Sequence, residues 1–269
     1  MQTSHIAHVA RSSRDTTPVR ILARVGFAVN GVVNAVIGII AIGIAVSRGG
    51  SADQSGAFAA IAAHPGGAVA LWIMSIALAA LGLWYVVGAF LHRSGEGAKK
   101  AATMAVEVGK GVAYGALAAT SFSFVVGTGN DSAEQSTSMT ANLLSTPGGV
   151  VAIVVVGLLF GAIGAYMVRK GVTRGFEEDI TVPSGRAGRG VRALGVFGYV
   201  ARGVALFIVG ILFVIAAFTV DASKATGLDG ALKSIADLPF GQIILVLVGL
   251  GFIAYGAYSV LRARLAKLS

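Results

Sequence analysis

The chain has 269 residues, of which 55% are hydrophobic and only 12% are charged, and its mean hydropathy is +0.81. A soluble domain carries about 25% charged residues, so this composition excludes an ordinary soluble fold. The absence of cysteine excludes disulfides, thiolate metal sites and cysteine nucleophiles. The formal net charge of +9 would suit nucleic acid, but the basic residues lie beside helix ends, so we predict no nucleic-acid partner.

Residues 1–20 are polar and are predicted to form a flexible cytoplasmic tail. Six apolar stretches follow, and each approaches or exceeds the ~20 residues that a helix needs to cross the hydrocarbon layer. They lie near 21–46, 67–91, 104–127, 148–168, 193–220 and 240–261. Backbone polar groups in lipid must bond internally, so the sequence predicts an all-α membrane protein with six transmembrane helices.

The six stretches form three copies of one unit. Gly31, Gly111 and Gly203 each begin an apolar run, and each run is followed by a proline, a short turn and a second apolar run. The units are 21–93, 104–170 and 193–263, and a basic cytoplasmic loop, 171–192, precedes the third. Two helices per unit make the repeats parallel, so we expect either a pseudo-threefold bundle or a linear row.

Short segments before the prolines, such as 56–61 and 230–235, have apolar residues at spacings of three to four. This spacing predicts short interfacial helices on the outer face. The prolines, Pro65, Pro147 and Pro239, then form outer-face elbows. A re-entrant pore loop is the alternative, although no filter-like polar run follows any of the prolines.

The basic residues give an orientation. Of the 21 lysines and arginines, all but Arg48, Lys224 and Lys233 fall in the N-terminal tail, the second and fourth loops, or the C-terminus. Cytoplasmic loops carry the excess of basic residues, so both termini are predicted to be cytoplasmic. We therefore expect a multi-pass protein of the inner (plasma) membrane that contacts anionic lipid headgroups on the cytoplasmic side.

Several short motifs resemble a bacterial membrane family called domain of unknown function 1206, whose two-helix unit occurs three times per protein. The matching segments are 198–203, 230–232, 239–241 and 255–258 in the third unit, and 26–27, 30–31, 65–67 and 82–84 in the first. The middle unit departs from this pattern, because Glu107 replaces an aromatic residue and Lys110 stands where the third unit has Arg202. The resemblance implies the architecture and no activity.

Glycines are the candidates for helix packing, because small residues let helix backbones approach closely in lipid. The candidates are Gly82, Gly111, Gly115, Gly157, Gly161, Gly164 and Gly256. Gly82, Gly164 and Gly256 each lie seventeen residues after the proline of their unit. A packing seam is the interpretation that we favour, and a glycine hinge is the alternative.

A second set of candidates is polar and lies near the cytoplasmic ends of the odd-numbered helices. It comprises Asn30, Asn34, Glu107, Lys110, Tyr114 and Arg202. Polar residues inside a membrane are costly and are candidates for function. Long basic side chains can instead reach the headgroups, and Glu107 can pair with Lys110 three residues later on the same helix.

We find no nucleotide-binding loop, metal-binding motif or nucleophile elbow, so the sequence predicts no catalytic residue, cofactor or metal. The first hypothesis is a non-enzymatic scaffold or a partner of other membrane proteins. The second is a small transporter or channel in which Asn30, Lys110 and Arg202 form a cationic vestibule on the cytoplasmic side. An enzyme acting on lipid is the weakest hypothesis.

Overall fold

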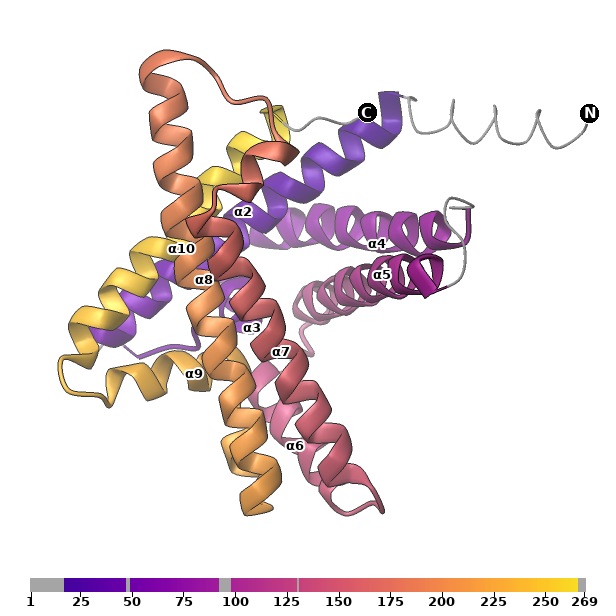
Figure 1. Cartoon of the computed structure of the whole chain (residues 1–269), viewed down its shortest axis with the longest axis vertical. Helices are drawn as coiled ribbons and strands as arrows, with labels where there is room; N and C mark the ends of the chain where they lie inside the picture. Colours follow the sequence, from indigo (N-terminus) through magenta and orange to yellow (C-terminus); the bar gives the residue numbers. More distant parts are fainter. Residues whose placement is uncertain (1–16, 47–48, 92–97, 130, 266–269) are drawn as a thin grey trace, which may run out of the picture.

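The structure is a computed structural model, and it describes residues 17–46, 49–91, 98–129 and 131–265. This part of the chain is helical and contains no β-strand (Figure 1). The long helices are α2 (Thr17–Ala45), α4 (Gly67–Leu91), α5 (Ala98–Val125), α7 (Gly149–Val172), α8 (Gly185–Thr219) and α10 (Gly241–Leu265). The short helices are α3 (Gln54–Ala62), α6 (Ser132–Leu144) and α9 (Gly227–Ala236), with single 3-10 turns at η1 (Gly175–Asp179) and η2 (Ala222–Lys224).

Each unit consists of a long helix, a short helix and a second long helix. The predicted segments 56–61 and 230–235 lie within α3 and α9. After each proline, one residue has a positive φ, which an L side chain rarely adopts. Two of these residues are glycines, Gly66 and Gly148, both at φ 81°, and the third is Phe240, at φ 62°. The same turn therefore reverses the chain three times and starts α4, α7 and α10.

The most extensive packing of the long helices is between units. The second helix of each unit packs along the first helix of the next, which gives the pairs α4 with α5 and α7 with α8. The third unit returns to the first, because α10 packs along α2. Figure 1 shows these three pairs as three arms that run in different directions.

Glycines face each other across all three pairs. A methyl group built on Gly31 would lie 2.7 Å from the carbonyl oxygen of Gly256. The corresponding distance from Gly111 to the carbonyl oxygen of Gly82 is 2.9 Å. A methyl group built on Gly203 would lie 2.7 Å from the carbonyl oxygen of Gly164. Such close approach increases van der Waals contact between helices, which is the main attraction available to them in lipid.

Within the described residues, five helices are long and apolar enough to cross a membrane. These are α2, α4, α7, α8 and α10; α5 does not qualify, although it has the required length. Its first half contains Lys99, Lys100, Glu107 and Lys110, which lower its mean hydropathy. The third unit also begins earlier than predicted, since α8 starts at Gly185 and the final residues of the expected basic loop 171–192 are helical.

The centre between the arms is filled by apolar side chains. Ile37, Leu71, Leu78, Leu245 and Phe252 are almost completely buried there. They come from α2, α4 and α10, and Ala118 of α5 and Ala205 of α8 join the same cluster. The fold therefore has a packed core where its three arms meet.

Candidate functional site

The basic residues of the polar set rest on aromatic rings. The Nζ atom of Lys110 lies 5.6 Å from the centre of the Tyr85 ring. Tyr85 in turn stacks on Tyr114, with ring centres 5.6 Å apart. The guanidinium carbon of Arg202 lies 4.6 Å from the centre of the Tyr255 ring. A cation over a ring face is attracted by the ring quadrupole, so these contacts fix the positions of both charges.

Tyr114 joins these two contacts. It lies close enough to Arg202, Arg262 and Tyr255 to interact electrostatically with them, and it also packs on the central apolar cluster. Tyr114 of α5 therefore interacts with side chains of α4, α8 and α10. Among the described residues, neither Lys110 nor Arg202 forms an ion pair or a side-chain hydrogen bond.

Lys110 lies over the Tyr85 ring of the neighbouring helix α4. Glu107 faces Gly88 of α4: a methyl group built on that glycine would lie 3.6 Å from its Oε2 atom. The matching positions of the other two helix pairs hold a basic residue over a ring. Arg262 lies 4.6 Å from the ring centre of Phe27, and Lys170 lies 6.0 Å from that of Tyr199.

The two asparagines of the set form hydrogen bonds with each other within α2. The Asn34 side chain is buried and donates to the backbone carbonyl of Asn30 at 2.7 Å and to its Oδ1 atom at 3.1 Å. These bonds satisfy the amide inside an apolar environment. The structure thus brings Lys110, Tyr114 and Arg202 into one neighbourhood and leaves the two asparagines in a local hydrogen bond within α2.

The predicted packing glycines fall into two groups. Gly82, Gly111, Gly157, Gly164 and Gly256 leave no room for a methyl group, because backbone atoms of the facing helix lie within 3 Å of its position. Two others have more space: nothing lies within 4 Å of a methyl group on Gly115, and the nearest atom to one on Gly161 is 3.9 Å away.

The sequence did not reveal an aromatic cluster around the turn between α7 and α8. Phe176, in the turn between α7 and α8, is fully buried and packs on Tyr199 and Tyr258 at ring-centre distances of 5.4 and 5.3 Å. The backbone N–H of Thr181 donates to the carbonyl of Leu265 at 2.8 Å. This segment therefore docks on α8 and α10 and is not a simple linker.

An acidic residue completes this docked segment. Asp179 accepts a hydrogen bond from Lys170 at 2.7 Å, and Arg262 lies 3.5 Å away. It thereby links the end of α7 to the end of α10. The signal in the sequence was the run Phe176 to Asp179, an aromatic residue and three acids inside a basic segment.

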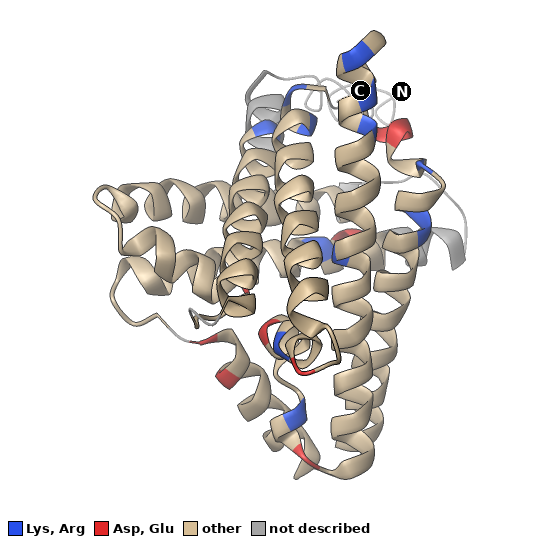
Figure 2. Cartoon of the chain, turned by 90° about the vertical axis from the view of Figure 1, so that its left-hand side faces the viewer, with Lys and Arg blue, Asp and Glu red and all other residues tan. Residues whose placement is uncertain are grey.

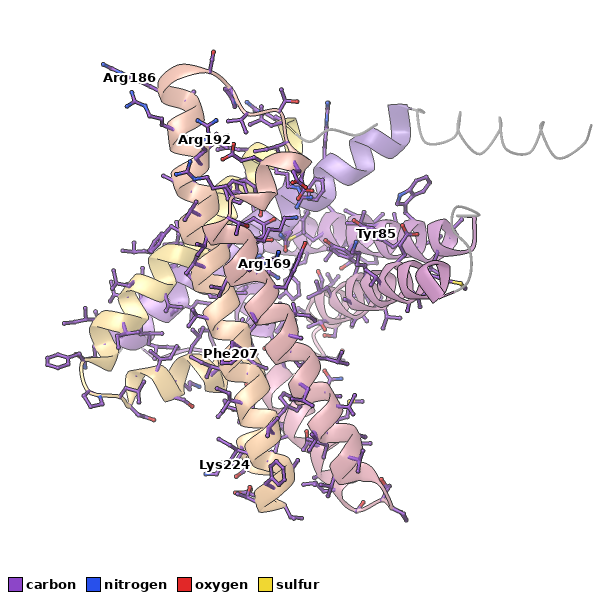
Figure 3. All side chains as sticks on the ribbon, in the orientation of Figure 1. Tyr85, Arg169, Arg186, Arg192, Phe207 and Lys224 are labelled. Carbon is purple, nitrogen blue, oxygen red and sulfur yellow. The ribbon has the colours of Figure 1, made fainter. Side chains whose placement is uncertain are left out.

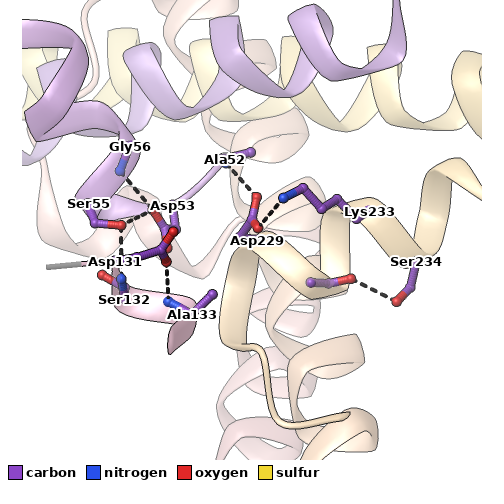
Figure 4. Close-up of polar contacts among 11 residues, drawn as sticks. Ala52, Asp53, Ser55, Gly56, Asp131, Ser132, Ala133, Asp229, Lys233 and Ser234 are labelled. Carbon is purple, nitrogen blue, oxygen red and sulfur yellow. Dashed lines mark hydrogen bonds and ion pairs between the residues drawn. The ribbon is translucent and has the colours of Figure 1, made fainter. Parts of the chain in front are cut away.

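On the opposite side, acidic residues begin two of the short helices (Figure 4). Asp53 caps α3 and accepts from the N–H of Gly56 at 2.9 Å, and Asp131 caps α6. Asp229, near the start of α9, accepts from the N–H of Ala52 at 2.8 Å and pairs with Lys233 at 2.7 Å. Within the described ranges, no group of three or more His, Asp or Glu residues could hold a metal ion.

Burial raises the pKa of Asp53 above its ordinary value, and the neighbouring carboxylates of Asp229 and Asp131 raise it further. The hydrogen bonds from Gly56 and Ser55 oppose this shift. The folded state therefore binds more protons than the unfolded chain between the ordinary and the raised pKa, so the free energy of unfolding falls as the pH rises through that interval.

Asp53→Asn keeps a capping side chain and removes the titration. We expect the melting temperature of the variant in detergent, relative to that of the wild type, to rise as the pH increases from about 4 to 7. Asp237→Asn, at an exposed position, is the control. A constant difference between Asp53→Asn and the wild type over this range would show that Asp53 does not titrate in this way.

These features define a class: an all-helical protein built from three repeated two-helix units, with helices apolar enough to cross a membrane. The family model described as Domain of Unknown Function (DUF1206) matches residues 25–92, 107–174 and 197–266, and the chain belongs to this family. It is similar to the Bacillus subtilis (strain 168) protein described as "Uncharacterized protein YxxB", with 26% identity over 95% of this chain and 94% of that protein. No solved structure matches.

Proposed function

We propose that the protein is a non-enzymatic scaffold of the inner membrane, with six spans in a pseudo-threefold arrangement, that works as a partner of other membrane proteins. The observation that carries this proposal is the packed apolar centre. A transporter needs a polar pathway between its helices, whereas here buried apolar side chains from all three arms fill that position.

The cyclic helix pairing supports the pseudo-threefold arrangement. Each of the three pairs joins the second helix of one unit to the first helix of the next, and each uses the equivalent pair of glycines. The sixth span in this arrangement is α5, which pairs with α4 as α8 pairs with α7. Its polar first half would then lie toward the cytoplasmic headgroups, where basic side chains are tolerated.

The charge distribution supports cytoplasmic termini. Lys and Arg gather at the end of the molecule that carries both ends of the chain (Figure 2). Arg186 and Arg192 lie at one end of α8 and Lys224 lies near the other (Figure 3). The end that bears the termini is therefore the more basic one, as the cytoplasmic side of a membrane protein is.

Single cysteines test this topology cleanly, because the natural chain has none. We expect Ser138→Cys, in α6, to react with a membrane-impermeant thiol reagent on intact cells, and Ser184→Cys, before α8, to react only after permeabilisation. Both serines are exposed in the structure. The opposite labelling pattern would reverse the orientation.

Anion flux tests the function. The protein in liposomes should give no flux of chloride, phosphate or carboxylates above that of protein-free vesicles, because apolar side chains pack together where the three arms of the described residues meet. If the wild type gives a flux, and the double variant Lys110→Ala, Arg202→Ala abolishes it, this result would contradict the scaffold proposal and support transport. Arg186→Ala with Arg189→Ala, which removes two exposed charges at the start of α8, is the matched control.

Transport through a cationic vestibule is the second candidate, and one observation favours it. Lys110 and Arg202 occupy the same position in their units, and both lie near Tyr114. Two cations near one another would attract an anionic solute. The packed core beyond them gives no support to an onward path.

A further inference from the structure

The middle unit differs from the other two in how its own long helices meet. In the first unit α2 packs on α4, and in the third α8 packs on α10, but α5 and α7 do not pack along their lengths. In Figure 1 the α4–α5 and α7–α8 arms run in different directions. One face of α5 and one face of α7 are therefore left without the partner that their equivalents have.

The exposure of equivalent residues on the first helices shows the same difference. Ala113 of α5 is exposed, whereas its equivalents Val33 and Ala205 are 6% and 0% exposed. Gly109, one turn earlier, is also exposed, whereas its equivalent Val29 is 8% exposed. The buried surface of the other two units is thus open on α5.

The second helices follow the same pattern. Ile163 of α7 is 49% exposed, whereas its equivalents Leu81 and Tyr255 are 4% and 8% exposed. Leu159 is 57% exposed, and its equivalent Ala77 is 5% exposed. Gly109 and Ala113 of α5 and Leu159 and Ile163 of α7 are thus apolar or small positions that are open in the middle unit, and we call these four positions the middle-unit face.

Basic residues lie at the cytoplasmic end of the middle-unit face. Lys110 is exposed, and it follows Gly109 and precedes Ala113 by three residues, which is nearly one helical turn. Arg202, on α8, interacts electrostatically with Tyr114, which is one helical turn after Lys110 on α5. Neither forms an ion pair with a carboxylate among the described residues, and the carboxylate of Glu107 lies near the Tyr85 ring on which Lys110 rests.

We propose that the middle-unit face binds an anionic phospholipid of the cytoplasmic leaflet. Its phosphate contacts Lys110 and Arg202, and an acyl chain covers Ala113, Leu159 and Ile163. The charges select an anionic headgroup, and the rings of Tyr85 and Tyr255 hold them in place. The leaflet rests on the orientation proposed above, and a lipid at this position would fill the gap that a helix fills in the other two units.

The test is native mass spectrometry of the purified protein after incubation with equimolar phosphatidylglycerol and phosphatidylcholine of identical chains. We expect the wild type to retain phosphatidylglycerol in preference to phosphatidylcholine. Lys110→Gln with Arg202→Gln should reduce that preference about thirtyfold, because each of the two basic side chains near a headgroup contributes on the order of 1 kcal/mol. Arg186→Gln with Arg189→Gln removes the same charge elsewhere and should leave the preference unchanged.

A second variant tests the apolar part and keeps both charges. Ala113→Trp places a large side chain on an exposed position, so it fills the surface without disturbing the core. It should reduce retention of phosphatidylglycerol, and glycerophosphate without acyl chains should not compete for the site. Effective competition by glycerophosphate would overturn the proposal in favour of a simple anion site.

Three other outcomes would also overturn it. One is equal retention of both lipids by the wild type, and another is an unchanged preference in the Lys110→Gln, Arg202→Gln variant. The third is complete disulfide formation between Ala113→Cys and Ile163→Cys in the membrane, which would show that α5 and α7 close on each other. Lipid retention and anion flux are separate measurements, so failure of the lipid site is distinguishable from failure of the scaffold function.

Discussion

Phe176→Ala is expected to lower the free energy of unfolding by about 3–5 kcal/mol, as truncation of a fully buried aromatic residue does. The Phe176 ring is 0% exposed and contacts both Tyr199 and Tyr258. A methyl group on Gly195 would lie 2.5 Å from it, so the ring fills a space that the glycine leaves open. Its loss would leave a cavity where the segment after α7 docks on α8 and α10.

Denaturant titration in detergent measures this change. Phe218→Ala is the matched control, because Phe218 is 76% exposed at the other end of α8 and should change the free energy of unfolding far less. Equal effects of the two variants would show that Phe176 is not buried in the protein. Limited proteolysis gives a second readout, since a released segment would be cut between α7 and α8 in the Phe176 variant only.

Gly164→Leu is expected to destabilise the protein by on the order of 1–3 kcal/mol, because it overpacks a helix contact. A methyl group on Gly164 would lie 2.6 Å from both the carbonyl oxygen of Gly203 and the backbone nitrogen of Phe207. These are backbone atoms, so the helices α7 and α8 must move apart to accept any side chain. Loss of close packing removes the main attraction between helices in lipid.

Gly161 provides the matched control, three residues earlier on the same helix. A methyl group there would lie 3.9 Å from the Phe207 side chain, which is ordinary van der Waals distance. Gly161→Ala should therefore leave the melting temperature in detergent unchanged or raise it, since alanine favours helix, whereas Gly164→Ala should lower it. Equal melting temperatures for these two alanine variants would show that α7 and α8 do not approach each other at Gly164.

The repeat in the sequence predicted much of this fold, because its glycines and prolines impose local geometry. A glycine that recurs in each unit indicates close backbone approach, and Gly31, Gly111 and Gly203 do lie against a second helix. The sequence could not show which helix that would be. Pairing across units depends on how whole helices fit together, and the spacing within one unit is the same for either choice.

The polar set was harder to predict, because local rules compete with contacts between helices. The spacing of Glu107 and Lys110 suits an ion pair on one helix, yet Lys110 lies over Tyr85 of another helix. The segment 171–192 was similar, since its basic residues predicted only a cytoplasmic loop. The buried side chain of Phe176 and the ion pairs of Asp179 fix that segment through residues more than 80 positions away in the sequence, such as Tyr258 and Arg262.

The pseudo-threefold arrangement of the proposed scaffold depends on the third unit closing back on the first. The most direct measurement is intrachain cross-linking of Phe27→Cys in α2 with Arg262→Cys in α10, whose natural side chains are in contact. A short bifunctional thiol reagent should join these two cysteines in membranes, and it should not join Phe27→Cys to Tyr166→Cys, on the exposed side of α7. Absence of the first cross-link, with both cysteines reactive, would contradict the closed arrangement of the three units.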